Sequence, residues 1–118
     1  MKLLSTKIHG TLDYITAFLL LAMPYMLNYD TCAIAGRIFL ILGVATILYS
    51  LITKYEFGLL NVIPMGLHLT LDVVSGIVLA ASPWLFGFQD KEFLPHLIIG
   101  LFEIIVALLT TVKTNYDS

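Results

Sequence analysis

Four long apolar segments alternate with short polar stretches along this chain of 118 residues. Each segment is close to the roughly 20 residues that a helix needs to cross a hydrocarbon core about 30 Å thick. The pattern therefore predicts an all-α membrane fold. Its four transmembrane helices are expected at about residues 8–28, 33–53, 65–87 and 94–112.

The polar stretches between these segments predict how the helices are paired. Residues 28–32 and 89–93 are short connections, which place the helices on either side of each connection next to one another and antiparallel. The middle stretch, KYEFGLLNVIP, is longer and mixed in polarity. We expect a single four-span membrane domain over residues 1–118, with a first hairpin at about 8–53, a linker at about 54–64 and a second hairpin at about 65–112.

The two predicted hairpins resemble each other in sequence. An offset of 59 residues aligns HGTLDYITAFLLLAMPYML with HLTLDVVSGIVLAASPWLF. An offset of 57 aligns ILGVATILYSLIT with IIGLFEIIVALLT, which pairs Thr53 with Thr110. Because each unit holds two spans, both units enter the membrane in the same orientation. The sequence thus predicts an internal duplication and a bundle of two parallel-repeat hairpins with pseudo-twofold symmetry.

The residues that the two copies share lie on one face of each predicted helix. Steps of three and four residues separate them, which is the spacing of one helical stripe. An ionisable side chain that faces lipid costs several kcal/mol, so this stripe is expected to face the bundle interior or the inner headgroups. The candidate functional stripe consists of His9, Asp13 and Thr16 in the first copy and His68, Asp72 and Ser75 in the second.

Two chemical interpretations of this stripe remain open beside a structural one. If the two stripes face each other, two imidazoles and two carboxylates meet, and these are ligands of zinc, iron or manganese. His9, Asp13, His68 and Asp72 are therefore a weak metal-site candidate, and two histidines clamping a haem are weaker still. Hydrogen bonds within and between helices are the preferred interpretation, and we expect no resident cofactor or metal.

Composition supports the bilayer and narrows the list of partners. Hydrophobic residues make up 59% of the chain and charged residues 12%, and the mean hydropathy is +0.97, which is far from the balance of soluble domains. The net charge of −2 without a basic stripe argues against nucleic acid as a partner. Cys32 is the single cysteine, so the chain can form neither an internal disulfide nor a thiolate cluster.

The positions of the basic residues predict the orientation in the membrane. Lys2, Lys7, Lys54 and Lys113 fall on one side, whereas Arg37 and Lys91 fall on the other. Because basic residues near span ends are retained on the cytoplasmic side, both termini are expected in the cytoplasm. Aromatic residues are then expected in two belts, with Tyr25, Tyr29, Trp84, Phe86 and Phe88 outside and Tyr55, Phe57 and Tyr116 inside.

Glu103 lies near the middle of the fourth predicted span. A bare carboxylate is costly there and needs a proton or a partner. Candidate partners are His96, Arg37 and Thr46. Glu103, His96 and Arg37 are therefore a candidate intramembrane relay or a set of partner contacts, because a polar chain that continued to the His-Asp pairs would cross the bilayer.

The second hairpin resembles the SPW repeat family, which comprises integral membrane proteins of bacteria and archaea. The residues that carry the resemblance are Asp72, Gly76, Leu79, Ser82, Pro83, Trp84, Leu85, Gly87 and Phe88. The first hairpin departs from the motif, with Ala17, Met23 and Tyr25 in place of its glycine, serine and tryptophan. The resemblance implies a multispanning protein of the inner membrane but no particular activity. Ser82, Pro83 and Trp84 are expected to form an interface anchor.

The chain shows no nucleophile paired with a base, no phosphate-binding glycine loop and no dinucleotide fingerprint. We therefore expect a non-enzymatic membrane protein that acts as a structural, accessory or interaction module, either as a homo-oligomer or within a larger membrane complex. The alternative is a proton- or ion-coupled permeation protein that uses its intramembrane carboxylates. A metal-binding membrane protein built on the His-Asp pairs is less favoured.

Overall fold

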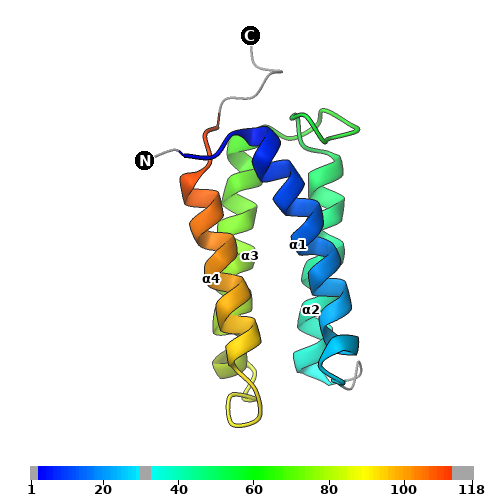
Figure 1. Ribbon diagram of the computed structural model, residues 1–118, viewed down its shortest axis with the longest axis vertical. Helices are drawn as coiled ribbons and strands as arrows, with labels where there is room; N and C mark the ends of the chain where they lie inside the picture. Colours follow the sequence, from blue (N-terminus) through cyan, green and yellow to red (C-terminus); the bar gives the residue numbers. More distant parts are fainter. Residues whose placement is uncertain (1–2, 30–32, 113–118) are drawn as a thin grey trace.

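The computed structural model describes residues 3–29 and 33–112 and contains four helices (Figure 1). They are α1 (Thr6–Met26), α2 (Ile34–Leu51), α3 (Met65–Leu85) and α4 (Leu94–Leu109). Within the described ranges the chain forms isolated bridges but no strand. The predicted all-α class is confirmed, and each predicted segment corresponds to one helix, although α1 begins two residues before its predicted segment. Lys2, Cys32, Lys113 and Tyr116, to which the sequence assigned roles, lie outside the described residues.

The helices form two hairpins arranged side by side (Figure 1). Helix α1 packs against α2 and α3 packs against α4, whereas α2 and α3 make the main contact between the hairpins. The start of α1, the end of α4 and the segment between α2 and α3 all lie at one end of the bundle (Figure 1). We call this the linker end. The end of α1, the start of α2 and the connection at residues 86–93 lie at the opposite end (Figure 1).

The bundle combines buried ionisable side chains, beside an apolar core, with an apolar surface. Its interior holds three histidines, two aspartates and a glutamate, and all six are buried. Its surface instead exposes large apolar side chains along every helix, for example Phe18, Ile41, Ile77 and Leu108, each more than half exposed. Apolar side chains on the outside and polar ones inside are what a lipid environment requires.

Two of the four helices are both long and apolar enough to cross a membrane. These are α2 with 18 residues and α3 with 21 residues. Helix α4 is apolar but has 16 residues, so it spans about 24 Å at 1.5 Å per residue. Helix α1 has 21 residues but carries part of the polar cluster described below.

Small residues allow the helices of each hairpin to pack closely. A Cβ atom on Gly100 would lie 2.6 Å from the carbonyl oxygen of Gly76 and 2.5 Å from the amide nitrogen of Ala80. In the first hairpin, a Cβ atom on Gly43 would lie 3.2 Å from the carbonyl oxygen of Ala17. Backbones therefore meet backbones where α3 crosses α4, as in other membrane helix pairs with small residues at their interface.

The Ser-Pro-Trp segment ends α3. Gly87 has φ +76°, and the amide of Phe88 donates to the carbonyl oxygen of Pro83 over 2.8 Å. This left-handed residue and six-residue hydrogen bond form a Schellman motif, which satisfies carbonyls at the end of a helix. Helix α1 ends in the same way, because Asn28 has φ 56° and the amide of Tyr29 donates to Pro24 over 2.7 Å. The family-like motif thus has a local structural role.

Candidate functional site

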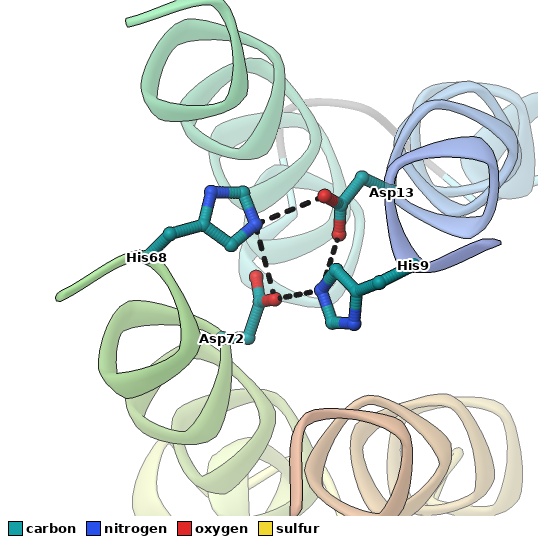
Figure 2. A group of neighbouring side chains, drawn as sticks. All are labelled: His9, Asp13, His68 and Asp72. Carbon is teal, nitrogen blue, oxygen red and sulfur yellow. Dashed lines mark hydrogen bonds and ion pairs between the residues drawn. The ribbon is translucent and has the colours of Figure 1, made fainter. Parts of the chain in front are cut away.

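Helices α1 and α3 each contribute a histidine and an aspartate to one buried cluster (Figure 2). These residues lie near the starts of the two helices, toward the linker end. His9 and Asp13 lie one helical turn apart on α1, and His68 and Asp72 lie one turn apart on α3. All four side chains are buried, with at most 6% exposure. One ligand atom from each residue can be chosen so that all four atoms lie within 4.8 Å of one another. The four residues are called the His-Asp cluster below.

The two imidazole Nε2 atoms face the two carboxylates across the cluster (Figure 2). His9 Nε2 lies 2.6 Å from Asp72 Oδ2 and 2.9 Å from Asp13 Oδ1. His68 Nε2 lies 2.9 Å from Asp13 Oδ2 and 3.3 Å from Asp72 Oδ2. The two His68 contacts are close in distance, but their directions do not meet hydrogen-bond geometry. His68 Nε2 is therefore a buried nitrogen directed between two carboxylates without a hydrogen bond.

The other ring nitrogen of His9 contacts the hydroxyl of Thr110, the residue that follows α4. His9 Nδ1 lies 2.8 Å from Thr110 Oγ1, and the Thr110 hydroxyl donates to the carbonyl oxygen of Val106 over 2.7 Å. A hydroxyl has one proton, and here the carbonyl receives it, so Thr110 Oγ1 accepts from His9 Nδ1–H. The network thus assigns the proton of a neutral His9 to Nδ1 and leaves the Nε2 lone pair directed at the cluster.

A second threonine holds His68 in the same way. His68 Nδ1 lies 2.7 Å from Thr53 Oγ1, and the Thr53 hydroxyl donates to the carbonyl oxygen of Tyr49 over 2.5 Å. Thr53 belongs to the first hairpin and supports a histidine of the second, whereas Thr110 does the reverse. These are the pairs that the offsets of 59 and 57 residues align. The two histidines therefore have equivalent threonine contacts, each from the opposite hairpin.

Tyrosine hydroxyls complete the surroundings of the carboxylates. Tyr55 donates to Asp13 Oδ2 over 2.8 Å, and Tyr49 donates to Asp72 Oδ1. Tyr55 lies in the segment between α2 and α3 and is fully buried. Burial and the neighbouring Asp13 carboxylate raise the pKa of Tyr55, so its phenol keeps its proton and remains a donor. Both aspartates thus have a fixed orientation.

This arrangement requires positive charge at its centre. Two neutral imidazoles with their protons on Nδ1 would direct lone pairs at two carboxylates from about hydrogen-bond distance. A proton on each Nε2 relieves the repulsion, and so does a metal ion between the four atoms. Metal bonds of about 2.0–2.1 Å in a tetrahedral site place neighbouring ligand atoms about 3.3 Å apart. The short contacts of 2.6 to 3.3 Å would need to widen, and the ligand atoms that lie up to 4.8 Å apart would need to come closer.

A small cavity adjoins the His-Asp cluster. It offers about 20 Å³ to the centre of a water molecule. Its walls come from α1, α2, α3 and α4, and its lining residues are His9, Leu12, Asp13, Thr16, Thr46, Asp72, Phe102, Glu103 and Val106. Glu103 is 9% exposed, and its Oε1 atom has no hydrogen-bond partner among the described residues. The cavity therefore joins Glu103 to three members of the cluster.

The remaining candidates of the polar stripe and the relay are distributed unevenly. Thr16 is buried and lines the cavity, whereas Ser75 is only partly buried and does not. Arg37 is exposed near the start of α2 and does not line the cavity around Glu103. Of the partners suggested for Glu103, only Thr46 shares its cavity.

His96 belongs to a separate aromatic group. Its Nε2 lies 3.0 Å from the carbonyl oxygen of Ala35, and its ring centroid lies 4.0 Å from that of Phe39 and 4.9 Å from that of Phe88. Tyr29 stacks at 6.0 Å on the same histidine. Because His96 lies in the first turn of α4, at the end opposite the linker, it does not extend the His-Asp cluster into a continuous relay of direct contacts.

The residues of the family-like motif lie away from the cluster. Ser82 is fully buried and donates to the carbonyl oxygen of Leu79 over 2.7 Å, and Pro83 is also fully buried. Trp84 is about half exposed and packs against Phe93 with a centroid distance of 5.7 Å. These positions suit a helix end with an exposed aromatic side chain.

Sequence reasoning missed the residues that orient the cluster. Tyr49 was not singled out, because its partner is 23 residues away. Tyr55 was expected in the inner aromatic belt, but its side chain is fully buried and donates to Asp13, 42 residues away. Thr53 and Thr110 did carry one, since the second offset pairs them, but their contacts with the histidines depend on the packing of α2 and α4.

Comparison with known proteins agrees with the fold. The profile of one family, described as the SPW repeat domain, matches residues 7–110. Neither the curated proteins nor the solved structures gave a significant match. The matched range covers all four cluster residues and both threonines that support them. The chain belongs to the SPW repeat family.

Proposed function

We propose that this protein is a non-enzymatic membrane protein that binds one divalent transition-metal ion in the His-Asp cluster. The ligands would be His9 Nε2, His68 Nε2 and one carboxylate oxygen each from Asp13 and Asp72. Because each hairpin supplies half of the ligands, bound metal would fix how the hairpins meet. The protein would thus serve as a metal-dependent accessory or sensor module of the membrane.

The observation that carries this proposal is the support of both histidines by threonine. Metal-bound histidines usually donate their other ring N–H to a fixed acceptor, which orients the ring. Thr110 and Thr53 supply that acceptor here, over 2.8 and 2.7 Å. The His68 Nε2 atom, which is buried and lacks a hydrogen bond, supports the same interpretation. This geometry is why we now favour metal over the purely structural role that the sequence suggested.

The donor set narrows the choice of ion. Two imidazole nitrogens and two carboxylate oxygens suit Zn²⁺, Fe²⁺ or Mn²⁺. Cu⁺ prefers sulfur ligands, and Ca²⁺ and Mg²⁺ prefer a shell of oxygens alone. Zn²⁺ is therefore a suitable probe.

The membrane arrangement belongs to the same proposal. Family membership, the two spanning helices and the apolar surface support a multi-pass protein of the bacterial or archaeal inner membrane. We infer that all four helices cross it and that the hairpins arose by duplication, because both use equivalent threonine and helix-end contacts. The basic residues near the linker end favour a cytoplasmic location for that end. The apolar exterior also favours a homo-oligomer or a larger membrane complex.

Proton or ion permeation is the second candidate function, favoured by Glu103 in a cavity that reaches the cluster. Reconstituted liposomes under a pH gradient would test it. Permeation predicts a proton flux that Glu103→Gln abolishes. Liposomes that contain the folded protein but show no proton flux would count against permeation.

Zinc titration of the purified protein tests the main proposal. Wild-type protein in mild detergent, stripped with a chelator, should bind one equivalent of Zn²⁺, measured by calorimetry and elemental analysis. His9→Gln and His68→Gln should each lose most of this binding. His96→Gln is the matched control, because His96 is equally buried but lies outside the cluster. Size-exclusion profiles and far-ultraviolet circular dichroism would verify folding, and a folded wild type that binds no zinc would overturn the proposal.

A further inference from the structure

The cavity beside the His-Asp cluster has the size of a water site. A cavity needs roughly 10–15 Å³ of space for water centres to hold one molecule. This one offers about 20 Å³. It is therefore large enough for a water molecule but too small for an organic ligand.

The surface of this cavity is mostly apolar, but three carboxylate residues are among those that line it. Asp13 and Asp72 contribute carboxylate oxygens, and Glu103 contributes the Oε1 atom that lacks a partner among the described residues. Thr46 also lines the cavity, but its hydroxyl proton is donated to the carbonyl oxygen of Leu42 over 2.8 Å. These carboxylates are the acceptors that a water molecule in the cavity would need for its two protons, since a buried water typically makes about three hydrogen bonds.

Glu103 stands where the two hairpins differ. The offset of 57 residues aligns it with Thr46, and both residues line the cavity from opposite hairpins. The Thr46 hydroxyl already donates its proton to a carbonyl oxygen within α2, so it needs no hydrogen-bond acceptor in the cavity. A buried carboxyl oxygen without a partner costs free energy, and such an atom in a native structure calls for a ligand or an ordered water.

We propose that the cavity is an open coordination position of the metal site and holds one water molecule between the ion and Glu103. This inference rests on the proposed function. Three of the four ligand residues line the cavity, so an ion among them would face its space directly. Zinc sites with an open position bind water there and can become five-coordinate. Glu103 would be a positioning residue that accepts a hydrogen bond from the bound water.

The electronic spectrum of Co²⁺ in the site tests this assignment. Five-coordinate Co²⁺ absorbs visible light more weakly than tetrahedral Co²⁺. Wild-type protein loaded with one equivalent should give the weaker spectrum. Glu103→Leu, which replaces the acceptor with an apolar side chain of similar size, should shift it to the stronger, four-coordinate spectrum. Thr46→Val is the matched control on the other wall and should keep the wild-type spectrum.

A measurement on wild-type protein alone makes the test independent of any variant. Mn²⁺ with a bound, exchanging water enhances the relaxation of solvent protons, so the Mn²⁺-loaded protein should show this enhancement. If the Mn²⁺-loaded protein shows no such enhancement, or if wild type and Glu103→Leu give identical Co²⁺ spectra, the open coordination position is refuted. Neither result would refute the metal site itself. Failure of the wild type to bind Co²⁺, Mn²⁺ or Zn²⁺ would overturn both.

Discussion

Replacing Thr110 with valine removes the acceptor of His9 Nδ1–H and preserves the shape of the side chain. His9 is 1% exposed and valine fills the space of the threonine, so no water takes the place of the lost hydroxyl. In the metal-free protein the proton can move to Nε2 and pair with Asp72, which lies 2.6 Å away. In the metal-bound protein Nε2 is a ligand, so Nδ1–H must remain buried and unpaired.

The Thr110→Val substitution therefore destabilises the metal-bound protein more than the metal-free protein. A buried unpaired donor costs about 1–3 kcal/mol. Since each 1.4 kcal/mol is a factor of about ten in affinity, Thr110→Val should weaken zinc binding by roughly 10- to 100-fold. Thr53→Val should have a similar effect, because Thr53 makes the equivalent contact with His68 over 2.7 Å.

The assay is a competition titration of Zn²⁺ against a chelator of known affinity, with each variant in the same detergent. Thr11→Val and Thr70→Val are matched controls. Each of these threonines donates to the carbonyl four residues earlier, as Thr110 does, but both hydrogen bonds are exposed. Unchanged zinc affinity in folded Thr110→Val and Thr53→Val would refute the proposed role of the threonines. An equal loss in the controls would show that the effect is not specific to the cluster.

Three further predictions concern the fold and its coupling to metal. Gly100→Ala should destabilise the α3–α4 hairpin by about 1–3 kcal/mol in a detergent unfolding titration, because the new Cβ atom would clash with the backbone of α3. Gly66→Ala is the control and should be neutral or stabilising, because its new Cβ atom would meet open space. Gly87→Ala should lower the free energy of unfolding by about 1–2 kcal/mol in the same titration, because the φ angle at this position is +76°. Gly87→Asn should lower it less, since Asn28 occupies the equivalent position after α1. Equal losses for the two variants would contradict this explanation. Free Zn²⁺ at about 100 times its Kd should stabilise the wild type by about 2.7 kcal/mol, which would appear as a rise in Tm. A chelator should reverse this rise, and His68→Gln should not show it.

The sequence allowed prediction of those features that depend on local periodicity. Four apolar segments predicted four helices, and the spacing of His9, Asp13, His68 and Asp72 predicted that they share one face on each of two helices. All four side chains are buried, as the cost of an ionisable group in lipid requires.

The remaining features depend on how the helices are placed relative to one another. Periodicity gives the face of a helix but not its axial position against a neighbour, so the contacts of Thr110 and Tyr55 with the cluster could not be derived. Arg37 illustrates the same limit, because a place inside a predicted span did not reveal that its side chain is exposed. His96 packs with Phe39 of α2 and with Tyr29 and Phe88, which follow the ends of α1 and α3, so its surroundings depend on both hairpins.

X-ray absorption at the zinc K-edge of the protein loaded with one equivalent of Zn²⁺ tests the central claim most directly. The account predicts nitrogen and oxygen neighbours at about 2.0–2.1 Å, with outer-shell scattering from two imidazole rings. His9→Gln should retain the signal of one ring at most. A zinc shell of oxygens without imidazole scattering in the wild type would contradict the account.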